Sequence, residues 1–245
     1  MDAALSIKKG SLSSFSLDGD HHVRRSCRNG DARMLGSRPV RVHTPETQVT
    51  FMARGSVGDE MDGEQLPIAG TRLRALRTLP DVRGSLTELF REAWATGFVP
   101  LQWNFVRSER NVLRGVHVHP RHDDYLIVLS GRVGAGMRDL RRGSPTEGQA
   151  VLVDLSGDTL NALTIPHGVA HGFYFHEPSL HVYAVSEYWD PEDELGCHWR
   201  DPGLQIPWPT PRALVSGRDE EAPPLRVLLD QLEPWQPIAA GRRVG

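Results

Sequence analysis

The sequence predicts a mainly β protein: an antiparallel jelly-roll barrel or sandwich, with a short C-terminal helix and a disordered N-terminal tail. Two observations predict this fold. From about residue 70 onward, short apolar stretches are separated by turn residues, among them Ser-Gly at 130–131 and the loop at 141–148, which is typical of antiparallel strands. In addition, all six tryptophans and all four tyrosines lie beyond position 90, so the large side chains that could fill a core belong to the same part of the chain.

The first 65 residues have a different composition. Phe15 and Phe51 are their only Phe, Tyr or Trp residues, and Ser, Gly, Arg and Asp are frequent. Such a segment buries too little apolar surface to offset the entropy that it loses on ordering. We therefore predict that residues 1–65 form a disordered tail, or an extension upstream of the true start, for which Met52 and Met61 are available. Residues 66–245 are predicted to form one domain.

The predicted domain holds ten strand candidates, chosen by apolar content, alternation and flanking turn residues. They span residues 72–76, 86–90, 102–108, 112–119, 125–130, 132–138, 148–155, 161–165, 170–175 and 180–187. After the last strand, Pro223 and Pro224 precede the segment LRVLLDQL. The apolar spacing of this segment fits a short helix.

The composition excludes several function classes. The formal net charge is -3 and the pI is about 6.4, so the chain has no general positive field of the kind that gathers nucleic acid. No apolar run approaches the length of about 18 residues that a membrane-spanning helix needs. The two cysteines form no CxxC pair. We therefore expect a cytoplasmic protein with neither nucleic-acid nor membrane partners.

Two histidine-containing stretches are the first candidates for a functional site. In LRGVHVHPRHDDYLIVLSGRV (113–133), His117 and His119 share one face of a strand, because side chains alternate. In IPHGVAHGFYF (165–175), His171 follows a Pro-x-Gly turn. The two stretches match the two motifs of the cupin fold, whose four metal-ligand positions are taken by His117, His119, Asp124 and His171. Imidazole and carboxylate at these positions suit Fe, Mn, Ni or Zn.

A longer match covers DVRGSLTE (81–88), QWNFVRSERNVLRGVH (102–117), LSGRV (129–133), RRGSPTEG (141–148), IPHGVAHGF (165–173), YAVSEYWDPEDELG (183–196) and WRDPGLQIPWP (199–209). In these segments, from about Leu66 to Leu225, the chain resembles the dTDP-4-dehydrorhamnose 3,5-epimerase family. The resemblance implies a cupin-fold isomerase of deoxysugar (rhamnose, polysaccharide) biosynthesis that works without a metal or other cofactor. It implies a nucleotide-linked keto-deoxysugar as the substrate and a homodimer whose N-terminal strands cross to the partner.

The resemblance also implies a role for individual residues. Epimerisation beside a ketone needs a base on one face of the sugar ring and an acid on the other, and imidazole suits the base because it titrates near neutrality. By position, His117 matches the base, Asp219 its carboxylate partner with a one-residue shift in spacing, and Tyr183 the opposing acid. The residues that match the nucleotide-sugar contacts are Arg83, Glu88, Gln102, Asn104, Arg114, His171, Glu194 and Arg218.

The chain departs from the family pattern at the start of one strand. Asp124 stands where the family carries a lysine, and His119 where it usually shows glutamine. An ionised carboxylate about 4 Å from an enolate costs about 4 kcal/mol at an effective dielectric constant of about 20, so His119, Arg121 or His122 would have to take the place of the lysine. Three hypotheses follow: an epimerase acting at C3, C5 or both, a metal-dependent cupin enzyme, and a nucleotide-sugar-binding homologue without catalysis.

Overall fold

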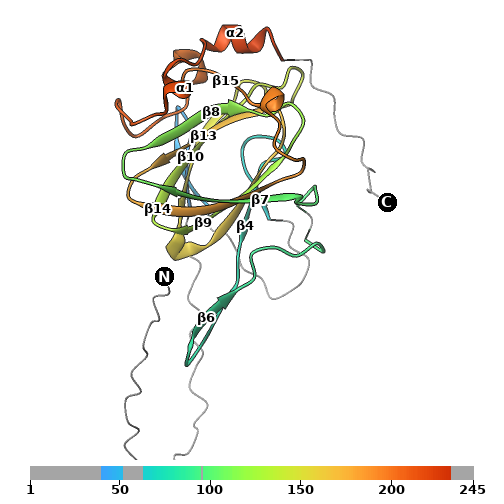
Figure 1. The fold of residues 1–245 in the computed structure, drawn as a ribbon, viewed down its shortest axis with the longest axis vertical. Helices are drawn as coiled ribbons and strands as arrows, with labels where there is room; N and C mark the ends of the chain where they lie inside the picture. Colours follow the sequence, from blue (N-terminus) through green and yellow to red (C-terminus); the bar gives the residue numbers. More distant parts are fainter. Residues whose placement is uncertain (1–39, 52–62, 95, 233–245) are drawn as a thin grey trace, which may run out of the picture. The chain divides into compact units, whose positions relative to one another are not determined.

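The computed structural model describes residues 40–51, 63–94 and 96–232, with the side chains of 48–51 left out. The domain is built on two antiparallel sheets that face each other (Figure 1). Sheet A has the strand order β15-β8-β13-β10-β11-β1-β2. Its strands are β1 (Val40–His43), β2 (Gln48–Phe51), β8 (Leu113–Val118), β10 (Arg132–Asp139), β11 (Ala150–Ser156), β13 (Val169–Phe175) and β15 (Leu195–Gly196).

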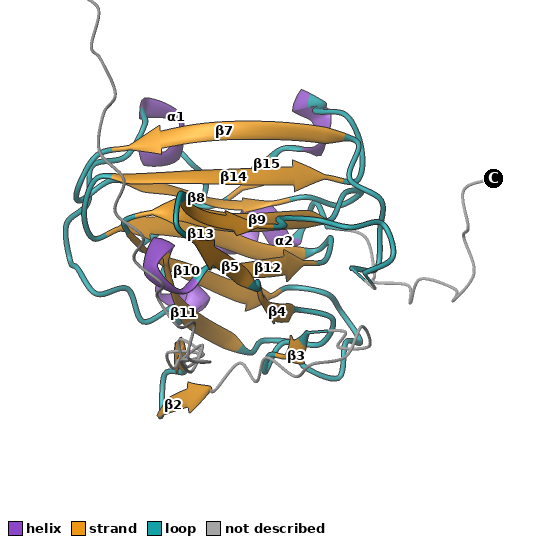
Figure 2. Ribbon diagram, turned by 90° about the horizontal axis from the view of Figure 1, so that it is seen from below, coloured by secondary structure: helices purple, strands orange, loops and turns teal. Residues whose placement is uncertain are grey.

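Sheet B has the strand order β3-β4-β12-β9-β14-β7, with β7 along one edge (Figure 2). Its strands are β3 (Glu64–Gln65), β4 (Arg72–Ala75), β7 (Gln102–Ser108), β9 (Asp124–Ser130), β12 (Asn161–Ile165) and β14 (Ser179–Val185). The helical segments are α1 (Gly217–Glu220), α2 (Leu225–Leu229) and the 3-10 turns η1 (Gly157–Thr159), η2 (Pro191–Asp193) and η3 (Pro202–Leu204). The prediction of a mainly β fold with a short C-terminal helix is confirmed, with α2 as that helix and α1 as an additional short turn of helix before it.

The core lies between the two sheets. Met137 and Phe175 from sheet A and Leu126 from sheet B are buried in one apolar cluster. The outer face of sheet A is covered by a second cluster, in which Trp199 and Leu228 of the C-terminal part pack on strands β8 and β13. Each strand of sheet A is therefore buried on both faces where the C-terminal segment covers it, and its inward side chains are confined to the space between the sheets.

The prediction of a disordered tail over residues 1–65 is wrong for residues 40–51 and 64–65. β1 pairs with β11 and with β2, so this part of the chain extends sheet A. Val40 and Val42 are 2% and 0% exposed, because their spacing of two places both side chains on the core face. Apart from Gly63, the other residues of the segment lie outside the described residues, and the boundary at residue 65 stays a prediction.

Residues 78–87 form a separate hairpin. Instead of one strand at 86–90, the chain makes β5 (Thr78–Asp81) and β6 (Gly84–Thr87), which pair only with each other. Most of its side chains are exposed. Figure 1 shows the hairpin at the end of the domain opposite β8 and α1. Among the described residues, the helices are all too short to cross a lipid bilayer.

Candidate active site

Strand β8 contains a β-bulge that determines which of its side chains lie on the inner face of the sheet. Its pairing with β13 passes from His117 opposite His171 to Gly115 opposite Gly172, so one residue of β8 has no partner. Gly115 has φ +114, and a Cβ added there would lie 2.8 Å from the Cα of Gly172, so only glycine fits this position. The bulge brings Arg114 and His117, three residues apart, to the inner face of the sheet.

His117 is hydrogen-bonded to a carboxylate from the far end of the chain. Its Nε2 lies 2.7 Å from Oδ1 of Asp219 in helix α1. Ser216 caps this helix by accepting a hydrogen bond from the Asp219 backbone N–H. Among the described residues, Nδ1 of His117 has no hydrogen-bond partner, and the side chain is 25% exposed. Nδ1 is therefore free to accept a proton.

The environment of Asp219 favours its ionised form. Burial by itself raises the pKa of this carboxyl group, but the hydrogen bond and electrostatic attraction of His117 and the hydrogen bonds from Ser216 and the Gly115 N–H outweigh it, so the pKa lies below its usual range. An ionised carboxylate at Nε2 holds the N–H on that nitrogen and stabilises the imidazolium form. The pair has the parts of a general base.

Tyr183 approaches the same space from sheet B. It lies on β14, next to Asn104 of β7 in the strand register, and packs against the inner cluster. Burial raises the pKa of Tyr183, and the negative charges of Asp124 and Glu194 raise it further. At neutral pH the phenol therefore keeps its proton and can donate it from the sheet that faces His117.

Three of the predicted sugar-binding residues line the inner faces nearby. Arg114 donates from Nε to Ser108 Oγ at 2.9 Å, and its charge lowers the pKa of Tyr183, which puts the guanidinium close to the phenol. On β7, Gln102 donates to Asn104 at 3.0 Å. The site therefore offers a cation and amide groups beside the proposed acid.

Glu194 and Arg218 connect the His117–Asp219 pair, called the dyad below, to a group of histidines that includes His119. Arg218, in the same helix as Asp219, donates to the Glu194 backbone carbonyl at 3.0 Å. The Glu194 carboxylate Oε1 lies 3.4 Å from Nδ1 of His119. The predicted residues 119, 194, 218 and 219 are thus brought together by three different segments.

His119, Asp124 and His171 form a buried cluster. One Oδ2 atom of Asp124 lies 3.9 Å from His119 Nε2 and 3.7 Å from His171 Nε2. Burial raises the pKa of Asp124 well above its usual range, with further contributions from Asp123, Glu194 and Asp193. Burial lowers the pKa of His171 to about 4 and lowers that of His119 more strongly. Both imidazoles are therefore neutral at physiological pH.

The cluster corrects the four-ligand metal hypothesis. Of its four residues, His119, Asp124 and His171 come within 4.8 Å of one another. His117 is not part of this group, because its ring nitrogens do not lie within that distance of all three residues; its Nε2 lies 2.7 Å from Asp219 Oδ1 instead. A metal-dependent enzyme that uses His117 as a ligand does not fit this arrangement.

The turn before His171 explains how the cluster is built. Gly168, at φ +76, follows Pro166 and His167 in a tight turn, and its N–H donates to the His119 backbone carbonyl at 2.8 Å. Asp123 accepts hydrogen bonds from the N–H and ring of His167. Asp123 is therefore a structural residue. The side chain of its neighbour Asp124, the first residue of β9, points to the other face and is buried in the interior.

Two of the proposed substitutes for the missing lysine are engaged elsewhere. His122 lies 2.7 Å from Asp193 through Nδ1, and Arg121 donates to the same carboxylate at 3.2 Å. Sequence reasoning gave Asp193 no role, although it belongs to the matching segment 183–196. The ring of His122 also stacks on that of His119, with centroids 3.9 Å apart. Asp193 therefore organises the loop beneath the cluster.

Two predicted site residues are not brought to this site. Arg83 is at the tip of the exposed hairpin, where it pairs with Asp81 at 2.6 Å. Glu88 follows the hairpin and lies 3.7 Å from Arg91. Within one chain, the hairpin and helix α1 lie at opposite ends of the domain (Figure 1). In this arrangement Arg83 does not reach the dyad of its own chain.

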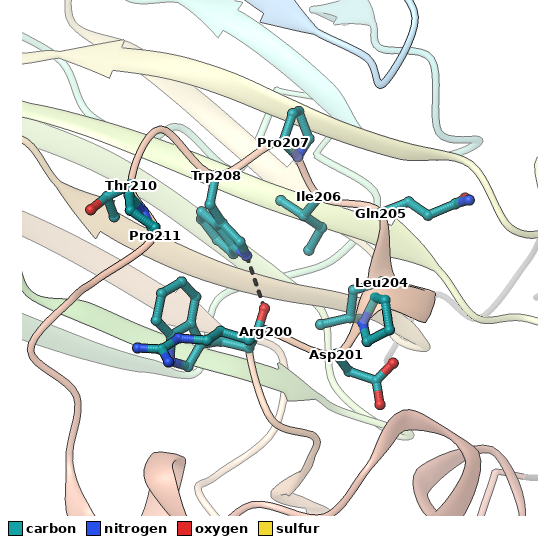
Figure 3. A pocket seen from close by; sticks show the side chains of 11 residues that line it. Arg200, Asp201, Leu204, Gln205, Ile206, Pro207, Trp208, Thr210 and Pro211 are labelled. Atoms are coloured by element: carbon teal, nitrogen blue, oxygen red, sulfur yellow. Dashed lines mark hydrogen bonds between the residues drawn. The ribbon is translucent and has the colours of Figure 1, made fainter.

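A cleft of about 400 Å³ lies on the other face of sheet A, away from the dyad. Figure 3 shows its wall, formed by residues of the segment 199–211, where Trp208 donates to the Trp199 carbonyl at 3.2 Å. A side chain at Gly136 would collide with Trp208, so the indole lies directly on the outer surface of the sheet. Asp201, the only acid of the cleft, caps η3 and accepts from the Leu225 N–H. The cleft has no acid and base paired for proton transfer.

Comparison with known proteins gives consistent matches. A profile of the dTDP-4-dehydrorhamnose 3,5-epimerase family matches residues 65–227. The dTDP-4-dehydrorhamnose 3,5-epimerase of Pseudomonas aeruginosa is 37% identical over 170 residues, which cover 66% of this chain and 94% of that protein.

Solved structures of sugar epimerases are also similar to this chain. An epimerase of Legionella pneumophila in complex with dTDP-4-keto-L-rhamnose has 33% identity and a TM-score of 0.65, covering 71% of this chain and 97% of that one. A 3'-monoepimerase of Streptomyces bikiniensis in complex with dTDP-quinovose has 30% identity and a TM-score of 0.61, covering 66% and 86%.

Proposed function

The chain belongs to the dTDP-4-dehydrorhamnose 3,5-epimerase family and is an epimerase, and from this premise we propose that it inverts C3, C5 or both in a dTDP-linked 4-keto-6-deoxyhexose. The observation that carries the proposal is the His117–Asp219 pair. His117 Nε2 lies 2.7 Å from Asp219 Oδ1, and His117 Nδ1 has no hydrogen-bond partner among the described residues. The relatives of known structure bind dTDP-linked sugars, and this chain offers cationic and amide side chains beside the dyad for the same class of ligand.

The proposed reaction is a transfer of protons on two faces of the sugar. His117 Nδ1 removes the proton from the carbon next to the ketone, and the electron pair of the broken C–H bond moves to the ketone oxygen to give an enolate. Asp219 stabilises the imidazolium that forms. Tyr183 then donates its phenolic proton to the opposite face of the same carbon, the enolate returns to the ketone, and solvent restores both side chains.

The test is deuterium wash-in at C3 and C5 of dTDP-4-keto-6-deoxyglucose in heavy water, followed by mass spectrometry and NMR. We expect exchange in the wild type and a loss of at least a thousandfold in His117→Asn. His43→Asn, on the distant strand β1, is the matched control and keeps the wild-type rate. Binding of the nucleotide sugar without exchange in the wild type would contradict the proposal and leave the non-catalytic homologue.

We further propose that the enzyme is a cytoplasmic homodimer. Trp103 and Phe105 are 45% and 55% exposed on β7, which is the edge strand of sheet B. Large apolar side chains on an unpaired edge favour a partner that covers them. A second copy of this chain would do so, and the exposed hairpin with Arg83 is then available to a neighbouring subunit.

A further inference from the structure

Three buried donor atoms converge beside the dyad without touching one another. Asp124 Oδ2 lies 3.9 Å from His119 Nε2 and 3.7 Å from His171 Nε2, and the three ligand atoms lie within 4.8 Å of one another. These separations exceed the range of about 2.7–3.2 Å for a hydrogen bond. They are closer to the spacing of about 3–3.5 Å between atoms that each lie about 2.1 Å from one shared ion.

The hydrogen bonds on the far side of each ring fix where the lone pairs point. His171 Nδ1 lies 3.0 Å from the Val169 carbonyl, and His119 Nδ1 lies 3.3 Å from the Asp193 carbonyl. A carbonyl oxygen only accepts, so both Nδ1 atoms carry the hydrogen. Both Nε2 atoms therefore present a lone pair to the carboxylate of Asp124. An outer hydrogen bond of this kind is what orients histidine ligands in metal sites.

Three facing lone pairs need a positive centre between them. In the described part of the chain, the two histidines are the ion-pair partners of Asp124, and no lysine or arginine is in contact with its carboxylate. No side-chain cation thus balances the carboxylate, whereas a divalent ion would balance it and bind both nitrogens.

We propose that His119, Asp124 and His171 bind one divalent first-row transition-metal ion, in a site separate from the His117–Asp219 dyad. Two imidazole nitrogens and one carboxylate oxygen suit Zn²⁺, Fe²⁺, Mn²⁺ or Ni²⁺, whereas Mg²⁺ and Ca²⁺ prefer oxygen donors throughout. Three protein ligands leave coordination positions for water or substrate. The site leaves His117 free as the base, so the metal and the epimerase chemistry are compatible in one pocket.

The role of the ion rests on the proposed function. Asp124 and His119 are two of the positions at which the chain departs from the resemblance, where a lysine and a glutamine are usual. A bound cation supplies, next to the ketone of the sugar, the positive charge that the lysine would otherwise carry. Asp124 in place of the lysine then causes no loss of charge stabilisation of the enolate, because the Asp124 carboxylate binds the metal ion that takes over the role of the lysine.

The experiment uses the full-length protein, stripped with chelator and titrated with Co²⁺. We expect one equivalent of Co²⁺ per chain, detected by its visible absorption and by calorimetry, and about one equivalent of a native metal by elemental analysis before stripping. Asp124→Asn and His119→Gln each weaken Co²⁺ binding by at least tenfold. Circular dichroism and thermal melting confirm that the variants are folded, and His119→Gln is the more conservative of the two.

Two control variants make the assignment specific. His117→Asn keeps the stoichiometry of Co²⁺, because that ring belongs to the dyad. His122→Asn also keeps it, although His119, His122 and Asp193 form a second possible group of ligands. Loss of binding in His122→Asn but not in Asp124→Asn would overturn the assignment in favour of that second group.

Failure of the metal site and failure of the proposed function are distinguishable. A folded wild type that binds no Co²⁺ overturns the metal site, with a proton on Asp124 in place of the ion, whatever the exchange assay shows. Stoichiometric binding that Asp124→Asn removes upholds the site, even if no deuterium enters the sugar. If the metal site and the proposed function are both correct, deuterium exchange by the stripped enzyme falls at least tenfold and returns when Co²⁺ or Zn²⁺ is added.

Discussion

Asp219 is the residue on which the protonation of His117 depends. Its carboxylate, held ionised by its surroundings, keeps the N–H on Nε2 and the lone pair on Nδ1. Asp219→Asn presents an amide that can donate to Nε2, which favours the wrong tautomer. We expect the deuterium-exchange rate to fall by about a hundredfold or more, measured at saturating substrate by mass spectrometry. An unchanged rate would mean that the carboxylate only anchors helix α1.

Tyr183 is predicted to decide the product rather than the first step. Because its pKa is raised by burial and by Asp124 and Glu194, it is a proton donor at neutral pH and not a base. In Tyr183→Phe, His117 still removes and returns a proton on its own face, so deuterium wash-in is expected to keep most of its rate while inverted product falls at least tenfold. NMR of the recovered sugar separates the two quantities. Equal loss of both would contradict these roles.

Single residues also show how far sequence reasoning reaches. The motif spacing predicted the convergence of His119, Asp124 and His171, whereas the pairing of His117 with Asp219, 102 positions apart, was implied only by the family resemblance. It did not predict that these are two separate groups. That separation depends on the helix that delivers Asp219 to Nε2, which no local pattern around His117 encodes. For the same reason Asp193, whose partners lie 71 and 72 positions away, received no role.

At the scale of elements, the loop between β10 and β11 is predicted to be a stability element. Asp139, fully buried, accepts hydrogen bonds from Arg141, Ser144 and Thr146. Asp139→Asn breaks a buried ion pair and should lower the free energy of unfolding by about 3 kcal/mol, measured by urea denaturation at pH 7. Glu147→Gln, at an exposed position of the same loop, is the control and should change it by less than about 0.5 kcal/mol.

The pH dependence of this effect has a definite sign. Burial by itself would raise the pKa of Asp139, but its hydrogen bonds, chiefly from Arg141, hold the pKa below its usual range. The unfolded chain has the ordinary value of about 3.9. The stabilisation is therefore fully present above about pH 4 and is lost as the pH falls through the folded value. The difference between wild type and Asp139→Asn should shrink toward pH 2, and a constant difference would contradict this explanation.

Elements whose pattern is local were predicted well, and elements defined by pairing were not. The strands β7 and β12 have the predicted bounds, because β7 begins with alternating polar and apolar residues and β12 lies between the turn residues 156–158 and Pro166. β1 was missed, because only Val40 and Val42 carry its apolar face in a polar segment. The hairpin of β5 and β6 was read as a single later strand, since its exposed side chains give no core-facing pattern.

At the scale of the whole molecule, the position of the hairpin raises the question of which site Arg83 serves. Its side chain is 86% exposed, and its own dyad lies at the other end of the domain (Figure 1). Arginine is suited to bind a pyrophosphate through paired N–H donors. If the enzyme is a symmetric dimer with hairpins that cross, each active site combines His117 of one subunit with the partner subunit's Arg83.

This arrangement predicts complementation between two defective variants. His117→Asn lacks the base, and Arg83→Ala should raise KM for the nucleotide sugar at least tenfold with a smaller change in kcat. In a dimer that contains one chain of each kind, one site lacks both residues and the other has both. Random assembly from equal amounts leaves about a quarter of all sites intact. Co-expression with two different affinity tags isolates the mixed dimer.

Measured at low substrate, the mixed dimer should have about half the deuterium-exchange rate of the wild-type dimer per dimer, because one of two sites is complete. Both parent variants stay far below that level. If Arg83 instead served its own chain, each site of the mixed dimer would carry one defect and the rate would equal the mean of the parents. A wild-type protein that is monomeric by light scattering while it is active would rule out crossing hairpins altogether, and would place Arg83 outside the active site.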